Sequence, residues 1–255
     1  MERKPSNEYI RIVQGADTAI LFVHGIIGTP NHFDRLIPLV PEHVSIYNML
    51  IDGHGQGVLD FGRSSLKRWE ASVHKVLDEL SKTHEKIYIV GHSMGTLLTM
   101  HEALTNKKIA GAFMLAIPIT IYLHPKMVPV SFRLVFDRIP PDNRYILDIF
   151  NCYGIDQDPN LLKYLTWIPR FIELSVLVHR TRKILPDFNI PCVAYQSAKD
   201  EVVFKSSINY LKKHSSITVK TLENSGHYHY PDDDLSYIIS EFDAFINPLR
   251  KVSEP

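Results

Sequence analysis

The sequence predicts an α/β protein whose mostly parallel sheet is covered by helices on both faces. Short apolar runs alternate with helical patterns along the first 118 residues. These runs are rich in apolar residues on both faces, which is typical of strands buried between two layers of helices. The chain has 255 residues, of which 45% are hydrophobic, and it can therefore bury a sizeable core in one or two domains.

Six apolar runs have the length of buried strands, and helical patterns separate several of them. The runs are residues 18–23, 44–51, 87–90, 112–116, 192–196 and 217–222. Apolar residues at helical spacing occupy 66–80, between the second and third runs, and 97–104, after the third. A final helix is expected from about Leu235, with residues 232–234 near its N-terminus, where the helix dipole favours their negative charge.

Residues 119–185 break this alternation of strands and helices. They carry scattered prolines, a mild excess of aromatic side chains and no clean strand. Because proline ends or kinks a helix, the pattern predicts short helices inserted between the fourth and fifth strands. The expected organisation is one core domain of residues 1–118 and 186–255, which this insert interrupts.

The charge balance and the cysteine content exclude several classes of protein. Lysine and arginine (28) cancel aspartate and glutamate (28), so we expect neither a nucleic-acid partner nor an anionic membrane surface. Cys152 and Cys192 are too few for a disulfide framework or a four-cysteine zinc site. No motif in the sequence implies a metal ion or an organic cofactor.

Signals for export or membrane insertion are not recognised in the sequence. The charged residues 1–5 lead into no apolar stretch of the kind found in a secretory signal. No run reaches the roughly 18 apolar residues that cross a bilayer. We therefore expect a cytoplasmic protein without an integral membrane segment.

A G-x-S-x-G pattern occupies residues 91–95, after the third strand and before a helical pattern. Ser93 would lie on a strained turn that exposes its hydroxyl at the N-terminus of the following helix. Glycine at 91 and 95 removes side chains that would collide with the neighbouring strand and helix. The pattern predicts that Ser93 is a nucleophile, and a glycine-rich turn with an N-cap serine is the structural alternative.

A serine nucleophile requires two partners further along the chain, a histidine base and an acid that orients it. Asp200 follows the 192–196 strand and His227 follows the 217–222 strand, so both are expected at the sheet edge where Ser93 lies. We predict that Asp200 is the acid and His227 the base, because each comes first after its strand. Glu201 and His229 remain alternatives for the two roles.

Backbone donors for a negatively charged oxygen are predicted beside Ser93. The first strand ends in residues 24–29, a loop that would place the N–H of Ile26 opposite the N–H of Met94. These two groups would form an oxyanion hole. The alternative is that the loop only connects a strand to a helix.

Together these motifs resemble those of serine hydrolases of the α/β-hydrolase superfamily, especially bacterial carboxylesterases and monoacylglycerol lipases. The resemblance rests on residues 24–25, 52–55, 91–95 and 225–227 and on Asp200, which together span most of the chain. It implies an α/β-hydrolase fold and a triad in the chain order serine, acid, histidine. It also implies that residues 119–185 form an inserted helical cap over the active site.

The expected function is hydrolysis of a carboxylic ester through an acyl-enzyme on Ser93. The small-molecule substrate would be a short-to-medium-chain acyl ester or a monoacylglycerol, with Phe132, Phe136 and Trp167 as candidates for the wall of the acyl pocket. A thioesterase, an acyltransferase or a carbon–carbon-bond hydrolase would use the same triad. A non-catalytic ligand-binding protein of the same fold is the alternative from a different class.

Overall fold

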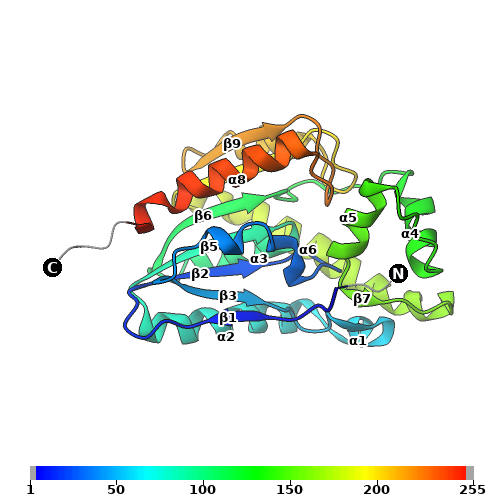
Figure 1. Cartoon of the computed structure of the whole chain (residues 1–255), viewed down its shortest axis with the longest axis horizontal. Helices are drawn as coiled ribbons and strands as arrows, with labels where there is room; N and C mark the ends of the chain where they lie inside the picture. Colours follow the sequence, from blue (N-terminus) through cyan, green and yellow to red (C-terminus); the bar gives the residue numbers. More distant parts are fainter. Residues whose placement is uncertain (1–3, 251–255) are drawn as a thin grey trace.

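The centre of the molecule is a seven-stranded sheet (Figure 1). The computed structural model describes residues 4–250. Its strands are β1 (Tyr9–Arg11), β2 (Thr18–Val23), β3 (Ser45–Met49), β5 (Lys86–His92), β6 (Ile109–Leu115), β8 (Cys192–Ser197) and β9 (Ile217–Leu222). They lie in the order β1-β3-β2-β5-β6-β8-β9, with β1 antiparallel to β3 and the other neighbours parallel. The mostly parallel sheet predicted from the sequence is confirmed.

All six predicted runs form strands, with ends that differ by at most three residues from those expected. The sequence pattern does not predict β1, because this strand has three residues and lies mostly exposed at the edge of the sheet. Register is regular through the centre, where Leu21 of β2 pairs with Tyr47 on one side and Ile89 on the other.

Helices fill the connections between the strands. The α-helices are α1 (Val58–Arg63), α2 (Leu66–Thr83), α3 (Met94–Ala103), α4 (Met127–Val135), α5 (Arg144–Cys152), α6 (Ile168–Ile184), α7 (Ser206–Leu211) and α8 (Asp232–Ile246). The 3-10 helices are η1 (Pro30–Phe33), η2 (Ile37–Leu39), η3 (Leu161–Trp167), η4 (Leu185–Asp187) and η5 (Asn247–Arg250). Within residues 4–250, no helix has both the length and the apolar character needed to cross a membrane.

The predicted helices at 66–80 and 97–104 correspond to α2 and α3. Helix α8 begins earlier than the expected Leu235, because Asp232, Asp233 and Asp234 form its first turn. Their negative charges there stabilise the positive end of the helix dipole.

The sheet separates two hydrophobic clusters. In β2, the fully buried Ala19, Leu21 and Val23 face the larger cluster, whereas Ile20 and Phe22 face the smaller one. This is the two-residue period of a strand buried on both faces. Side chains of α2, α3 and α6 cover the first face, and those of α8, η1 and η2 cover the second.

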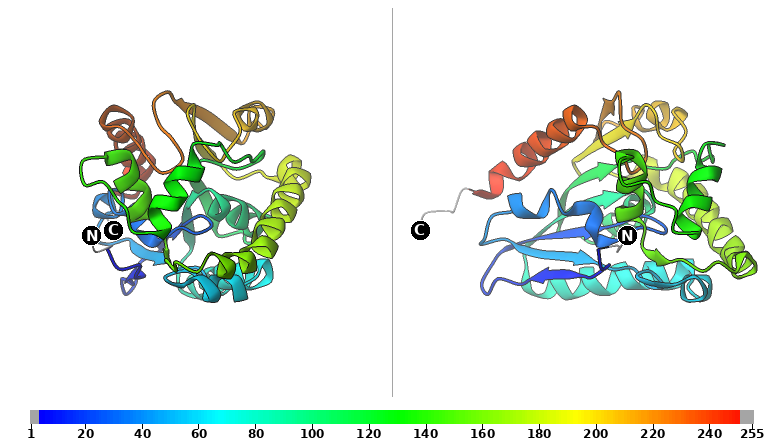
Figure 2. Two further views of the ribbon diagram at one scale, coloured as in Figure 1. Left: turned by 90° about the vertical axis from the view of Figure 1, so that its right-hand side faces the viewer. Right: turned by 45° about the vertical axis from the view of Figure 1, so that its right-hand side comes forward.

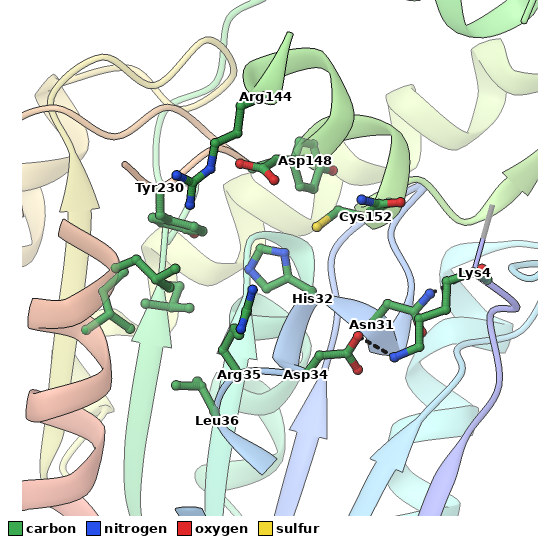
Figure 3. Close-up of a pocket in the computed structure, with 15 residues that line it drawn as sticks. Lys4, Asn31, His32, Asp34, Arg35, Leu36, Arg144, Asp148, Cys152 and Tyr230 are labelled. Carbon is green, nitrogen blue, oxygen red and sulfur yellow. Dashed lines mark hydrogen bonds and ion pairs between the residues drawn. The ribbon is translucent and has the colours of Figure 1, made fainter. Parts of the chain in front are cut away.

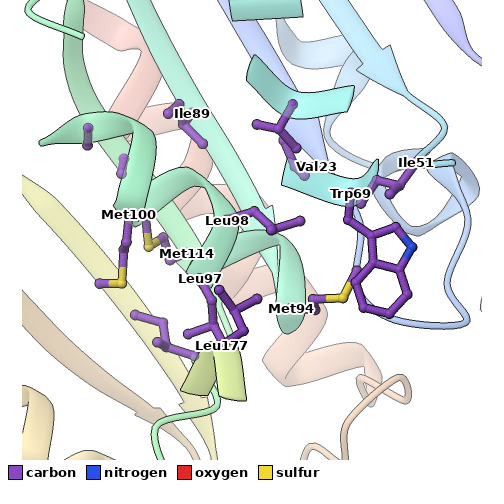
Figure 4. Close-up of a cluster of buried hydrophobic side chains, with 14 of the residues drawn as sticks. Val23, Ile51, Trp69, Ile89, Met94, Leu97, Leu98, Met100, Met114 and Leu177 are labelled. Atoms are coloured by element: carbon purple, nitrogen blue, oxygen red, sulfur yellow. The ribbon is translucent and has the colours of Figure 1, made fainter. Parts of the chain in front are cut away.

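Helix α3, which follows Ser93, lies inside the larger cluster. Eight of its ten residues are buried, as expected of a helix that is covered on all sides. Figure 4 shows Met94 beside Trp69 of α2, and Leu97 beside Leu177 of α6. This packing fixes the N-terminal end of α3, where Ser93 stands.

The chain between β6 and β8 carries α4, α5, η3, α6, η4 and the two-residue strand β7 (Ile155–Asp156), which pairs with β4 (Gln56–Gly57). Its α4, α5 and β7 gather at one end of the sheet (Figures 1 and 2). Helices α4 and α5 share a small hydrophobic cluster, whereas α6 packs into the large one. At 17 residues, α6 is longer than the short helices expected. The division into a core domain and a cap at 119–185 stays a prediction.

Candidate active site

Ser93 occupies the sharp turn between β5 and α3. Its backbone has φ 51° and ψ −124°, which a residue other than glycine adopts only at an energetic cost. The Ser93 N–H donates to the carbonyl oxygen of Leu115 (2.9 Å), and Thr96 Oγ1 donates to the carbonyl oxygen of Ser93 (2.6 Å). These two bonds hold the strained turn in place.

Glycines around Ser93 allow three segments of the chain to approach it closely. A Cβ atom on Gly95 would lie 2.2 Å from the carbonyl oxygen of Val23, and one on Gly91 would lie 3.1 Å from Thr96 Cα. On the loop that faces the turn, a Cβ atom on Gly25 would lie 2.8 Å from Ser93 Cβ. The end of β2, the start of α3 and the loop after β2 therefore meet at the serine.

His227 and Asp200 continue a line of hydrogen bonds from Ser93. His227 Nε2 lies 3.1 Å from Ser93 Oγ, and His227 Nδ1 lies 2.9 Å from Asp200 Oδ2. The backbone N–H groups of Val202 (2.8 Å) and Val203 (2.7 Å) donate to Asp200 Oδ1 and orient the carboxylate. The structure thus brings together the three side chains that the sequence singled out, each just after the carboxyl end of its strand.

Glu201 and His229 lie nearby but make different contacts. Glu201 Oε2 accepts the backbone N–H of His227 (2.7 Å), and His229 Nδ1 lies 2.7 Å from Asp148 Oδ2 of α5. Among the hydrogen bonds of residues 4–250, neither side chain reaches Ser93 or the ring of His227. The geometry favours Asp200 and His227 as the acid and the base.

The two predicted oxyanion donors stand on either side of the serine turn. Ile26 follows Gly25, the residue in close contact with Ser93. Its N–H donates to no other group of the described chain. Met94 is the first residue of α3, where a backbone N–H has no partner within the helix. Both N–H groups are therefore available to a ligand oxygen.

Two residues to which the sequence analysis gave no role, His54 and Gly154, hold the loop that carries Ile26. The next residue, Ile27, has φ 51°, an unfavourable conformation for a β-branched side chain. Its N–H donates to His54 Nε2 (3.0 Å), and its carbonyl oxygen accepts the N–H of Gly154 (2.7 Å). The Gly-His-Gly turn at 53–55 was visible in the sequence, but its contact with the loop arises only from the fold, and Gly154 carried no signal.

Most of the imidazoles packed around the site are neutral at pH 7. Burial, reinforced by neighbouring histidines, lowers the pKa of His92 well below its usual 6.5 and that of His32 to about 3. Burial also lowers the pKa of His54 to about 4. His92 Nε2 lies 3.0 Å from the carbonyl oxygen of His227, to which it donates in its Nε2-protonated form. His92 therefore supports the His227 loop without adding charge to it.

A cavity of about 310 Å³ lies next to the site (Figure 3). Its walls include His32, Cys152, Tyr228 and Tyr230, and the ring of His32 lies 3.8 Å from that of His92. Ser93 does not line this cavity and is only 3% exposed.

The three aromatic candidates for an acyl-pocket wall lie apart from one another. Phe132 and Phe136 are 52% and 42% exposed and stack with ring centroids 6.3 Å apart. Trp167 is buried, and its Nε1 donates to the carbonyl oxygen of Val58 in α1 (2.8 Å). Trp167 therefore anchors the insert to the body of the molecule, and the two phenylalanines lie at its surface.

A serine on a strand-to-helix turn of a parallel sheet, in line with a histidine and an aspartate from later strands, is the arrangement of the α/β hydrolases. Comparison with known proteins leads to the same class. A model of the alpha/beta hydrolase family matches residues 20–236, and the chain belongs to this family.

Three similar proteins of this class are named as lipases or lipolytic enzymes. The chain is 25% identical over 233 residues to a thermostable monoacylglycerol lipase of Bacillus sp. (strain H-257), covering 89% of both chains. A solved structure of the metagenome-derived lipolytic enzymes LipS and LipT has a TM-score of 0.73 at 18% identity, covering 97% of this chain and 100% of that one. A monoacylglycerol lipase from Paleococcus ferrophilus has a TM-score of 0.64 at 17% identity, with 94% and 99% covered. The two structures support the fold.

Proposed function

We propose that this protein is a serine hydrolase that cleaves carboxylic esters through an acyl-enzyme on Ser93. The observation that carries the proposal is the continuous line Asp200–His227–Ser93, with separations of 2.9 and 3.1 Å between the facing atoms. Such a line allows a weakly nucleophilic hydroxyl to lose its proton as it attacks. The curated relative at 25% identity, a monoacylglycerol lipase, supports an ester as the substrate.

The first half of the reaction forms the acyl-enzyme. His227 Nε2 takes the proton of Ser93 Oγ while that oxygen attacks the ester carbonyl carbon. The carbonyl oxygen becomes an oxyanion, which the N–H groups of Ile26 and Met94 stabilise. When the tetrahedral intermediate collapses, His227 gives the proton to the leaving alkoxide, and the alcohol departs.

The second half releases the acid. His227 takes a proton from water, whose oxygen attacks the acyl carbon, and a second tetrahedral intermediate forms in the same oxyanion hole. Its collapse breaks the bond to Ser93 Oγ, which recovers its proton from His227. Throughout, Asp200 holds the Nδ1 proton of His227 and stabilises the transient imidazolium.

We infer a monoacylglycerol or another acyl ester of short to medium chain as the substrate. The named relative supports this class, and α4 and α5 of the insert form an apolar cluster against which Tyr228, the neighbour of His227, packs. Thioester cleavage, acyl transfer and carbon–carbon-bond hydrolysis would need the same triad, and an acyl thioester in the substrate test distinguishes the first of these from ester hydrolysis.

Ser93→Ala tests the proposed function directly. We expect a loss of roughly 10⁴-fold or more in the kcat for p-nitrophenyl esters, because the nucleophile is gone, and an unchanged far-ultraviolet circular dichroism spectrum. The panel should include butyrate, octanoate and laurate esters, a monoacylglycerol and an acyl thioester. A fluorophosphonate probe should label the native protein and not the variant. Retention of a tenth of the activity would rule out Ser93 as the nucleophile.

A further inference from the structure

Glu201 is a buried carboxylate that the mechanism above does not use. Its side chain is 2% exposed, and a charge so buried requires charged or hydrogen-bonding partners. Oε2 accepts the backbone N–H of His227 (2.7 Å). Oε1 accepts bonds from two groups of the insert, Lys126 Nζ (2.8 Å) and Tyr145 Oη (2.9 Å). Glu201 therefore connects the loop of the proposed base to the segment above it.

Two consecutive carboxylates thus hold the same histidine at two points. Asp200 holds the ring of His227 at Nδ1, and Glu201 holds its backbone N–H. Gly226 makes the second contact possible, because a Cβ atom there would lie 2.7 Å from Glu201 Oε1 and 2.8 Å from Oε2. The position of Nε2 relative to Ser93 depends on both the ring and the backbone being fixed.

The insert reaches this carboxylate from two of its helices. Lys126 immediately precedes α4, and Tyr145 lies in the first turn of α5. Lys126 Nζ also lies 5.4 Å from the centroid of the Tyr145 ring, a favourable cation–π geometry. Both helices must therefore be seated on the body of the molecule for Glu201 to keep its partners.

The chain just before α4 adds two bonds to the same acidic loop. Tyr122 Oη donates to the carbonyl oxygen of Asp200 (2.7 Å), and the N–H of His124 donates to the carbonyl oxygen of Glu201 (2.9 Å). The acid loop is thus fixed from the insert by backbone as well as side-chain contacts.

We propose that Glu201 is a positioning residue for His227, and that Lys126 and Tyr145 couple this positioning to the seating of the insert. The inference rests on the proposed function, since it assigns His227 as the base. When α4 and α5 pack against the core of the molecule, Lys126 and Tyr145 bind Glu201, and Glu201 in turn fixes the His227 loop. When α4 and α5 lift away, Glu201 loses Lys126 and Tyr145, and the loop is held less firmly.

The charges around His227 predict a change in the pH profile of the reaction that a purely structural role of Glu201 would not produce. The charged groups are Asp200, Glu201 and Lys126. The rings of His32, His92, Tyr122, Tyr145, Tyr228 and Tyr230 are uncharged, because burial lowers the pKa of the two histidines and raises the pKa of the four tyrosines. His229 faces Asp148 of α5, with Nδ1 2.7 Å from Oδ2. Removing the charge of Glu201 leaves Lys126 uncompensated, and removing Lys126 leaves Glu201 uncompensated.

The acid limb of the pH profile of kcat/KM should therefore move in one direction when Glu201 loses its charge and in the other when Lys126 loses its charge. That limb reports protonation of the base in the free enzyme. Glu201→Gln should shift it by roughly half a pH unit to lower pH, because a negative charge near an imidazolium is lost. Lys126→Met should shift it by a similar amount to higher pH, because a positive charge is lost.

The experiment compares Glu201→Gln, Lys126→Met and Tyr145→Phe with the matched control Glu173→Gln. Glu173 also joins the insert to the body through a carboxylate, accepting the N–H of Leu66 (3.1 Å) and pairing with Arg170 (2.9 Å), but on α6. We expect kcat for p-nitrophenyl butyrate to fall about 10-fold in Glu201→Gln and less in the other two insert variants, at nearly constant KM. Glu173→Gln should keep the native kcat and pH profile.

Fluorophosphonate labelling of Ser93 distinguishes a failure of the proposed function from a failure of the positioning role. A native protein that neither labels at Ser93 nor hydrolyses any ester overturns the proposed function. A native protein that labels and hydrolyses, together with Glu201→Gln and Lys126→Met variants that match Glu173→Gln in kcat and in pH profile, overturns the positioning role. Should Glu201→Gln fail to fold, the opposite limb shift in Lys126→Met and the kcat of Tyr145→Phe decide the question.

Discussion

Ser93 and Ile27, the residue that follows the proposed oxyanion donor Ile26, both adopt φ 51°. Such conformations cost on the order of 1–3 kcal/mol each and persist only where surrounding contacts impose them. The contacts come from outside each turn, from Leu115 for Ser93 and from His54 for Ile27. Backbone strain is thereby present at the proposed nucleophile and next to the proposed oxyanion donor Ile26.

The paired histidines and acids provide a prediction at this scale. His227→Ala and Asp200→Asn should each lower kcat by about 10⁴-fold, because the base is lost in the first and its tautomer in the second. His229→Ala should change kcat by no more than a few fold, since this ring pairs with Asp148 at the surface of α5. Steady-state kinetics with p-nitrophenyl butyrate measure all three. If His229→Ala were the more damaging histidine change, the base would have to be reassigned.

The sequence could predict that Ser93, Asp200 and His227 lie together, because each follows a recognisable strand and parallel strands end at one edge of the sheet. It could not predict the contacts of Glu201. Lys126 and Tyr145 lie in the proline-broken insert, whose helical register the sequence does not define, and they approach Glu201 from more than 50 residues away in the chain. The same reason hid the bond between Gly154 and Ile27.

At the scale of elements, the buried strands were predictable and the edge elements were not. Strands β2 and β5 bury nearly every side chain, so their apolar runs identify them. Strand β1 is mostly exposed, and β4 and β7 have two residues each, so these strands leave no periodic pattern to recognise. Helix α6 escapes a pattern-based prediction of its length because apolar residues lie on its exposed side too, such as Ile172 and Val176.

Gly154 connects the insert to the loop of the proposed oxyanion hole, and Gly154→Ala tests that connection. A Cβ atom there would lie 1.9 Å from the carbonyl oxygen of Gly28, so the two segments must separate. The bond from Gly154 N–H to Ile27 would then weaken, and kcat should fall about 10-fold or more while the fold persists. The rate of fluorophosphonate labelling should fall with it.

Gly57→Ala is the matched control for this change. Gly57 lies in β4, which pairs with β7 just after Gly154, and the neighbour of its added Cβ would be only Asp60 Oδ2, at 3.3 Å. This variant should keep the native kcat and labelling rate. Native kinetics in Gly154→Ala as well would mean that the insert does not support the oxyanion loop.

At the scale of the whole molecule, the fold buries several imidazoles in neutral form. His24, His54 and His92 are 0%, 2% and 1% exposed, and burial lowers the pKa of each, to about 4 for His54 and well below 6.5 for the other two. In the unfolded chain the same groups bind protons near pH 6.5. Between the two values, unfolding takes up protons.

The free energy of unfolding should therefore decrease steeply on mild acidification. The unfolded state binds more protons below pH 6.5, so the stabilisation is complete above that pH and is lost as the pH falls towards 4. Each of the three histidines contributes a slope that approaches about 1.4 kcal/mol per pH unit well below pH 6.5. Between pH 6.5 and 5.5 this amounts to about 1 kcal/mol each, or about 3 kcal/mol together. Domains of ordinary stability have only about 5–15 kcal/mol in total, so the loss should be large.

Urea unfolding at pH 7.5, 6.5 and 5.5 measures this dependence, and two histidine variants identify its source. His54→Gln should reduce the loss of stability between pH 6.5 and 5.5 by about 1 kcal/mol, whatever its effect on stability at pH 7.5, because one buried proton acceptor is gone. His43→Gln should leave the slope unchanged, since His43 is exposed. A native protein equally stable at pH 7.5 and 5.5 would mean that the buried rings gain protons in the folded state as well. The bond from Ile27 N–H to His54 requires a neutral ring, so in that case it could not hold the loop after β2.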